Sequence, residues 1–144
     1  MNIVVIDGQG GRLGRRLVEG IHQICPGEEI LAIGTNSIAT QNMMNSGCAA
    51  RLATGENAVI VACRSADIIV GPVGIATADA LMGEISPAMA NAVASSRAYR
   101  VLIPMNLCNT YVAGAVKSSA AILEDAVDHI RRLIQGTVRT DDHE

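Results

Sequence analysis

The sequence predicts a single α/β domain with a doubly wound, mostly parallel sheet between two layers of helices. Two observations lead to this fold class. Short unbroken apolar runs alternate along the chain with segments of helical period, and the first run is followed by a glycine-rich turn and then a helix. The 144 residues suffice for one such domain, and 49% hydrophobic with 17% charged residues suits a sheet covered on both faces.

Four apolar runs, each about as long as a strand, are rich in β-branched residues, which is typical of strands buried on both faces of a parallel sheet. They comprise residues 3–6, 30–33, 68–70 and 101–103. We expect a further short strand over 48–52. The segment 58–63 is β-branched enough for a strand, but a helix there leaves 62–67 as a short link into the strand at 68, so a helix is predicted.

Helices are indicated by apolar stripes at helical spacing and by residues typical of helix ends. One stripe consists of Leu13, Leu17, Ile21 and Ile24, and another of Ile122, Ala126, Ile130 and Leu133. The boundary signals are Pro26-Gly27 after the first helix, Ser86-Pro87 at the start of another, and Ser118 or Ser119 before the last. The predicted domain covers 1–136, and 137–144 is expected to be a disordered tail.

Composition argues against several classes of function. A net charge of −3, with Tyr99 and Tyr111 as the only aromatic residues, does not suit a nucleic-acid partner. The four cysteines are widely spaced, which predicts neither a metal site nor a disulfide framework, and instead favours free thiols in a reducing cytosol: Cys25, Cys48, Cys63 and Cys108. Neither a signal peptide nor a membrane-spanning run is recognisable, so we expect a cytoplasmic protein.

The first turn reads Asp7-Gly8-Gln9-Gly10-Gly11-Arg12-Leu13-Gly14 and contains G-x-x-G-x-x-G between a strand and a helix. Residues without a Cβ allow a tight turn, close approach of the backbone to a phosphate, and close packing of helix on strand. The context is Rossmann-like and favours a phosphate or dinucleotide cradle. A glycine turn that serves packing alone is the alternative.

Charged residues around this loop bear on the ligand. Arg12, Arg15 and Arg16 lie near the positive end of the helix dipole, where a cation is unfavourable. An anion beside Arg12, the best placed of the three, would make that arrangement favourable. The alternative is that these arginines are solvated surface charges. Asp7 would repel a phosphate. It is expected to accept the loop's own N–H groups, or else to hold a divalent ion beside a phosphate.

Ligands of open α/β sheets sit beyond the carboxyl ends of the strands, so the loops there supply the other candidates. Thr35, Asn36, Gly71 and Asn106 are predicted to join Gly8, Gly10, Gly11, Arg12 and Gly14 in a cofactor site. The second strand ends in Gly34-Thr35-Asn36 rather than in the acidic residue of a dinucleotide site, although the hydroxyl and amide can still bind a ribose. Glu84 and Asp79 are expected to be solvated carboxylates, with a general base or a ligand contact as the alternative for either, and Cys108 is a weaker candidate for a reactive thiol.

Two resemblances follow from these residues. The stretch Gly8 to Arg15 resembles the G-x-x-G-R-M-G-R nucleotide-binding loop of dihydrodipicolinate reductases, which implies a cofactor-loop role with NADH or NADPH for Gly8, Gly11, Arg12 and Gly14. It covers only the first strand, turn and helix, and the chain has no room for a substrate domain, so it does not imply that reaction. Over nearly its whole length the chain resembles a small bacterial family described only as a domain of unknown function, through residues 5–11, 34–36, 53–58, 71–75, 83–89 and 103–106.

The sequence therefore predicts a nucleotide-binding protein, with NAD(P) or another phosphate-bearing small molecule held by the Gly8–Gly14 loop and no reaction specified. The alternative is a non-catalytic ligand sensor or protein-interaction module whose glycine loop is structural; a small hydrolase or isomerase using Glu84 or Cys108 is a third candidate. A homodimer is expected through the apolar segment 71–89, with Ile75, Leu81, Met82, Ile85 and Met89 at its surface.

Overall fold

The computed structural model describes residues 1–105, 109–115 and 117–137. It contains five strands, five α-helices and one 3₁₀ helix within these residues. In chain order they are β1 (Ile3–Asp7), α1 (Arg12–Ile24), β2 (Ile30–Gly34), α2 (Ser37–Met44), β3 (Arg51–Thr54), α3 (Glu56–Cys63), β4 (Ile68–Pro72), η1 (Val73–Ala76), α4 (Pro87–Ser95), β5 (Tyr99–Ile103) and α5 (Ser119–Ile134).

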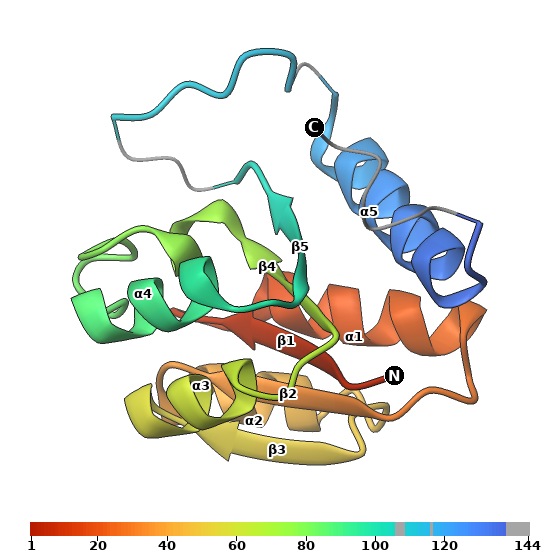
Figure 1. The fold of residues 1–144 in the computed structure, drawn as a ribbon, viewed down its shortest axis with the longest axis horizontal. Coiled ribbons are helices and arrows are strands. Elements are labelled where there is room, and N and C mark those ends of the chain that lie inside the picture. The colour runs from red at the N-terminus through yellow and green to blue at the C-terminus, as the bar shows by residue number, and fades with distance from the viewer. Residues whose placement is uncertain (106–108, 116, 138–144) are drawn as a thin grey trace.

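The strands form one parallel sheet in the order β3-β2-β1-β4-β5, so the α/β fold class is confirmed (Figure 1). The chain runs outward from β1 to β3, then returns to β4 on the other side of β1. The strand order therefore reverses between β1 and β4, which is where open sheets of this kind bind ligands beyond the strands' carboxyl ends.

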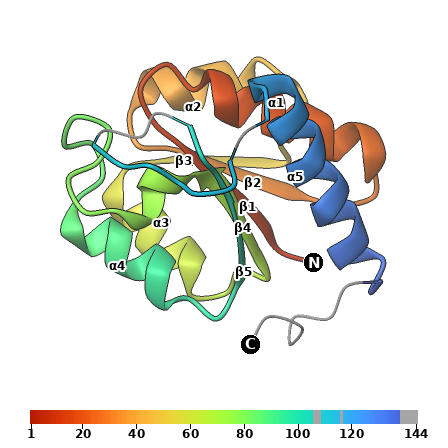
Figure 2. The same ribbon diagram turned by 90° about the horizontal axis from the view of Figure 1, so that it is seen from above.

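Helices cover both faces of the sheet in three layers. Figure 2 shows α1, α2 and α5 on one side and α3 and α4 on the other. Alternate side chains of each buried strand enter opposite cores: Ile3 and Val5 of β1 pack with α1 and α5, whereas Val4 and Ile6 pack with α3 and α4. All five residues of β1 are buried, as the unbroken apolar run predicted.

The predicted strands and helix ends are confirmed with one correction. The runs at 3–6, 30–33, 68–70 and 101–103 all lie in strands, and 58–63 lies in α3. The strand expected over 48–52 is wrong, because β3 spans Arg51–Thr54. Before it, the backbone N–H of Cys48 donates to the Ser46 hydroxyl, which keeps that segment in a turn. β3 is an edge strand with exposed ends, so its apolar pattern is weak.

Serine side chains begin two helices as predicted. The Ser86 hydroxyl accepts from the N–H of Met89 at the start of α4, and the Ser118 hydroxyl accepts from the N–H of Ala121 at the start of α5. After α5, Thr137 donates from its backbone and hydroxyl to the carbonyl of Arg132. The rest of the predicted tail, 138–144, lies outside the described residues.

The segment 71–89 does not form the apolar surface expected for a homodimer. Of the five apolar residues expected at that surface, only Met82 faces solvent, with 93% of it exposed. The other four are buried in the core beneath α3 and α4: Ile75, Leu81, Ile85 and Met89. The segment folds back on itself through residues with positive φ: Asp79, Leu81, Met82 and Gly83. This compact turn buries its apolar side chains within a single chain, so they are not available to form the predicted dimer surface.

No helix in the described part of the chain is long and apolar enough to cross a membrane.

Candidate functional site

The candidate site lies at the carboxyl ends of β1 and β2, where three loops meet. They are the glycine loop between β1 and α1, the short link between β2 and α2, and the connection between β4 and α4. The first two are joined by a backbone hydrogen bond of 2.9 Å from the Thr35 N–H to the Asp7 carbonyl. Side chains from the second and third loops then fix the glycine loop from outside.

The Asp7 carboxylate fixes the glycine loop from inside. It is buried and accepts from the backbone N–H of Gly8 at 2.8 Å and from that of Gly14 at 2.7 Å. Burial raises the pKa of Asp7 above its ordinary value, and the two N–H groups oppose that shift. The expectation that Asp7 accepts the loop's own N–H groups is confirmed. One of the donors left over at the start of α1 is thereby satisfied.

Glu84 reaches the glycine loop from the β4–α4 connection. Its Oε2 accepts from the N–H of Gln9 at 2.6 Å and from the Thr35 hydroxyl at 2.9 Å, and its Oε1 accepts from the Asn36 amide at 3.1 Å. The expectation of a solvated carboxylate is therefore wrong. Seventy-five residues separate Glu84 from Gln9, so no local spacing in the sequence indicates this contact.

Two asparagines of the α2 region orient the loop's peptide groups. The Asn36 amide donates to the carbonyl of Gln9 at 3.0 Å, and the Asn42 amide donates to the carbonyl of Gly10 at 2.9 Å. C=O and N–H point in opposite directions across a trans peptide, and the described bonds include no cis peptide. The N–H of Gly10 therefore points away from Asn36.

Three of the loop glycines are required by packing against the protein itself. A Cβ on Gly8 would lie 2.4 Å from Glu84 Oε2, and one on Gly11 would lie 2.6 Å from the carbonyl oxygen of Ala39. Gly11 also has φ +71°, which favours glycine. A Cβ on Gly14 would lie 2.7 Å from the Cβ of Asp7. We call Asp7, Gly8, Gly11 and Gly14 the closed half of the loop.

The remaining part of the loop is open. A Cβ on Gly10 would meet no heavy atom of the described residues within 4 Å, and Gly10 and Arg12 are exposed. Within those residues, no acceptor contacts the backbone N–H of Gly10, Arg12 or Leu13. We call Gly10, Arg12 and Leu13 the open half of the loop. The first turn of α1 carries no acidic residue, so these donors keep their positive character.

The sequence model of one family, described as "Domain of unknown function (DUF3842)", matches residues 2–135. The chain belongs to this family. That confirms the resemblance to a family of unknown function. Among curated proteins, none matches the chain. The solved structures that match the chain include a dodecameric FMN-dependent UbiX-like decarboxylase from Escherichia coli O157:H7. The match has 15% identity and a TM-score of 0.44, over 100% of this chain and 98% of that chain.

The structure brings most of the predicted site residues together in this member of the family, though in different roles. Thr35 and Asn36 stand beside the glycine loop, but both donate to Glu84. Gly71 is buried within β4, where a Cβ would lie 2.2 Å from the carbonyl oxygen of Ile6, so its lack of a side chain serves sheet packing. Asn106 and Cys108 lie outside the described residues.

Arginines near the loop divide into paired and unpaired groups. Arg15 donates to Glu19 at 2.8 Å and to the Asn42 side chain at 3.3 Å. Arg12 and Arg16 are exposed, and neither has an ion pair or hydrogen bond from its side chain within the described ranges. Arg12, in the first turn of α1, is therefore the cation available to a ligand at the open half.

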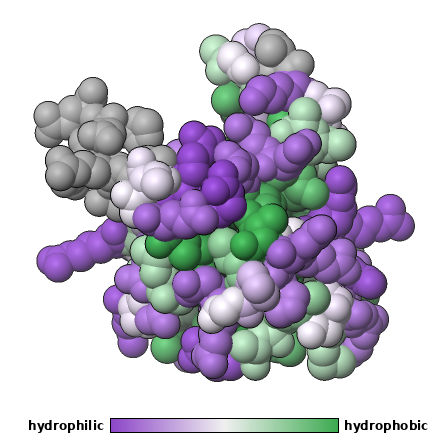
Figure 3. All heavy atoms as spheres, turned by 90° about the vertical axis from the view of Figure 1, so that its right-hand side faces the viewer, coloured by the Kyte–Doolittle hydropathy of each residue, from purple (hydrophilic) through white to green (hydrophobic). Residues whose placement is uncertain are grey.

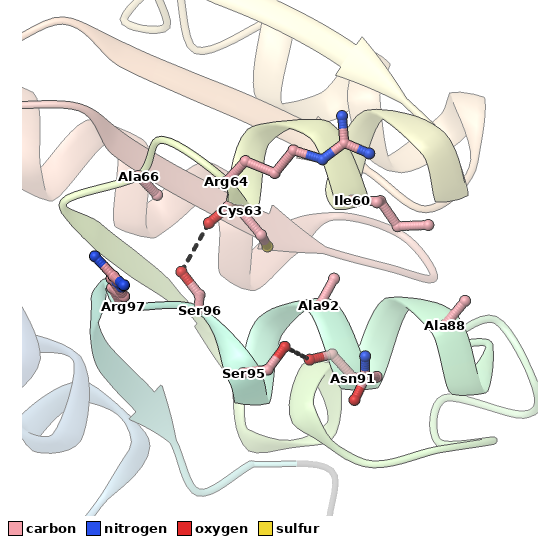
Figure 4. Close-up of a pocket in the computed structure, with 10 residues that line it drawn as sticks. All are labelled: Ile60, Cys63, Arg64, Ala66, Ala88, Asn91, Ala92, Ser95, Ser96 and Arg97. Atoms are coloured by element: carbon pink, nitrogen blue, oxygen red, sulfur yellow. Dashed lines mark hydrogen bonds between the residues drawn. The ribbon is translucent and has the colours of Figure 1, made fainter.

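A cavity outside this site lies between α3 and α4 (Figure 4). Its volume is about 530 Å³, and one end lies at the links that lead into the amino ends of β4 and β5. Ser95 and Ser96 line it, but their hydroxyls donate to the backbone carbonyls of Asn91 and Cys63. Burial raises the pKa of the Cys63 thiol to about 11, which makes it a poor nucleophile. These groups serve the helix ends.

A second groove, of about 400 Å³, lies between α1 and α5 and is lined in part by Ile24, Leu123 and Val127. On the side of the molecule drawn in Figure 3, apolar surface is limited and surrounded by polar side chains.

Among the described residues, no group of three or more His, Cys, Asp and Glu side chains is placed to hold a metal ion. The convergence of donors at the carboxyl ends of β1 and β2 therefore makes that edge the best candidate site.

Proposed function

We propose that this protein binds a nucleotide, with a phosphate of the ligand on the open half of the glycine loop. The observation that carries the proposal is the group of backbone N–H donors at Gly10, Arg12 and Leu13, which have no acceptor among the described residues. They stand at the N-terminus of a 13-residue helix, beside the point where the strand order reverses. Such a terminus attracts anions through both its donors and its dipole.

Arg12 supports a negatively charged ligand. A cation in the first turn of a helix is ordinarily unfavourable by some tenths of a kcal/mol, because the dipole there is positive. No acidic residue of that turn offsets it. A bound phosphate would accept from the backbone and pair with the guanidinium at once. NAD(P) is the preferred ligand class, and another phosphate-bearing small molecule meets the same requirements.

The two carboxylates of the site limit where such a phosphate can sit. Asp7 and Glu84 already accept from Gly8, Gln9 and Gly14. A phosphate near those donors would face like charge, which disfavours it. The open half is therefore the place on the loop where an anion is best accommodated.

The second candidate function is an interaction module whose glycine loop is purely structural. The packing of Gly8, Gly11 and Gly14 favours it, because contacts within the chain already account for these three glycines. It predicts no ligand at the open half.

A thermal-shift panel with NAD⁺, NADH, NADP⁺, NADPH, ATP, GTP and coenzyme A separates these candidates, alongside mass spectrometry of any ligand released on denaturation. A ligand at about 100 times its Kd stabilises by roughly 2.7 kcal/mol, which raises the midpoint by several degrees. We expect a selective shift that Arg12→Ala removes. Arg16→Ala, at another exposed position of α1, is the matched control and should keep it. Absence of both a shift and a released ligand would favour the interaction module.

A further inference from the structure

Glu84 occupies a position that gives it a further role if a nucleotide binds. In sheets of this type the ribose of a bound nucleotide lies near the end of the second strand, where an acidic side chain commonly accepts its hydroxyl groups. Here β2 ends at Gly34 and is followed by Thr35 and Asn36. The carboxylate beside that strand end comes instead from Glu84, through its hydrogen bonds to both side chains.

We propose that Glu84 accepts the ribose 2′-hydroxyl of the nucleotide, so that the site takes ligands with a free 2′-hydroxyl and rejects those with a 2′-phosphate. This inference rests on the proposed function. It assigns the phosphate and the sugar to separate parts of the site: the open half of the loop binds the phosphate, and the Glu84 carboxylate binds the sugar.

The Glu84 carboxylate has acceptor capacity left for such a hydroxyl. A carboxylate has about four lone-pair positions on its two oxygens. Oε2 already accepts two hydrogen bonds, from Gln9 and Thr35, whereas Oε1 accepts one, from Asn36. A hydroxyl can donate to the remaining position on Oε1. A phosphate cannot donate when ionised, and it would meet the charges of both Glu84 and Asp7.

The carboxylate is held in place by the fold rather than by its own bonds alone. Leu81 and Ile85, which flank the Glu84 turn, are buried in the core, and the N–H of Ile85 donates to the carbonyl of Ala80. The absence of a Cβ at Gly8 provides the space that Glu84 Oε2 occupies. An acceptor positioned before the ligand arrives loses little conformational entropy on binding.

Three adenine nucleotides that differ only at the 2′ position test the proposal in titration calorimetry of the wild-type protein. They are AMP, 2′-deoxy-AMP and adenosine 2′,5′-bisphosphate. We expect AMP to bind about tenfold more tightly than 2′-deoxy-AMP, which corresponds to about 1.4 kcal/mol for one hydrogen bond to a charged acceptor. The bisphosphate should bind more weakly still.

Glu84→Gln should weaken AMP binding about tenfold and remove the difference between AMP and 2′-deoxy-AMP. Glu124→Gln, at an exposed position of α5, is the matched control and should leave both affinities unchanged. If Glu84→Gln fails to fold, the affinities of the wild-type protein for the three nucleotides still test whether the site binds the 2′-hydroxyl. Equal binding of all three ligands, or tighter binding after Glu84→Gln, would overturn the role of Glu84 while leaving the proposed function intact. Binding of none of the three, together with no shift for any nucleotide in the thermal-shift panel, would overturn both.

Discussion

The two halves of the glycine loop differ in whether contacts within the chain occupy their backbone N–H groups and the space around them. In the closed half, the N–H groups of Gly8 and Gly14 donate to the buried Asp7 carboxylate, and Gly11 packs against the backbone of Ala39. In the open half, Gly10 has free space around it, and its N–H lacks an acceptor within the described residues, like those of Arg12 and Leu13. A single glycine-rich pattern thus combines positions that build the fold with positions that remain available to a ligand.

The largest effect is expected from Gly11→Ala in the closed half. The new Cβ would lie 2.6 Å from the Ala39 carbonyl oxygen, and the residue would keep φ +71°. Strain from the left-handed backbone and from overpacking together should lower the free energy of unfolding by about 4 kcal/mol. Urea denaturation measures this loss. A loss below about 1 kcal/mol would show that α1 and α2 are not packed as closely as described here.

A smaller loss is expected from Asp7→Ala. The substitution leaves the N–H groups of Gly8 and Gly14 buried without an acceptor, which should cost about 2 kcal/mol of unfolding free energy. The same denaturation assay checks it. Asp67→Ala is unsuitable as a control, because Asp67 accepts from the N–H of Asn2, whereas Glu29→Ala, at an exposed position, is a control for loss of a carboxylate. Equal stability of Asp7→Ala and wild type would contradict the role of Asp7.

The pH dependence of stability gives a third and weaker effect. Burial raises the pKa of Asp7 in the folded state above its ordinary 3.8. Between the unfolded and the folded pKa of Asp7, the folded state binds more protons than the unfolded state. The part of the stability that is linked to protonation of Asp7 is therefore present below pH 3.8 and is lost as the pH rises through the folded pKa. The difference in unfolding free energy between wild type and Asp7→Asn should therefore show this slope. The opposite slope would mean that the hydrogen bonds outweigh desolvation.

The smallest effect on stability is expected from Gly10→Ala in the open half. A Cβ there meets nothing within 4 Å among the described residues, and the φ of Gly10 is outside the left-handed region. The unfolding free energy should change by no more than about 0.5 kcal/mol. Compared with Gly11→Ala in the same assay, this variant isolates the difference between the halves. A loss as large as that of Gly11→Ala would remove the distinction.

Local patterns were enough to predict the sheet, the first helix and the capping serines. Their signals lie within a few residues, as in the apolar run 3–6 and in Ser86-Pro87. The position of Glu84 could not be predicted in this way, because it depends on how a compact turn between β4 and α4 is folded. The same turn buries Leu81 and Ile85, which is why the predicted dimer surface is wrong. Apolar content alone does not show which side of a loop faces the core.

The candidate site also differs from the cavity between α3 and α4 in whether its polar groups are available to a ligand. That cavity is large, but the hydroxyls of Ser95 and Ser96 along its wall are used by nearby carbonyls. The glycine loop has donors without acceptors in the described part of the chain, together with an exposed arginine. Unsatisfied donors beside a helix N-terminus are therefore a better guide to a ligand here than volume is.

A titration of ¹⁵N-labelled protein with NAD⁺, followed through the backbone amide resonances, tests whether the open half of the glycine loop binds the ligand. We expect saturable shifts concentrated at the amides of Gly10, Arg12 and Leu13, with a much smaller change at Gly14, whose N–H already donates to Asp7. Unchanged resonances at the open half, or shifts gathered instead along the cavity between α3 and α4, would contradict this expectation.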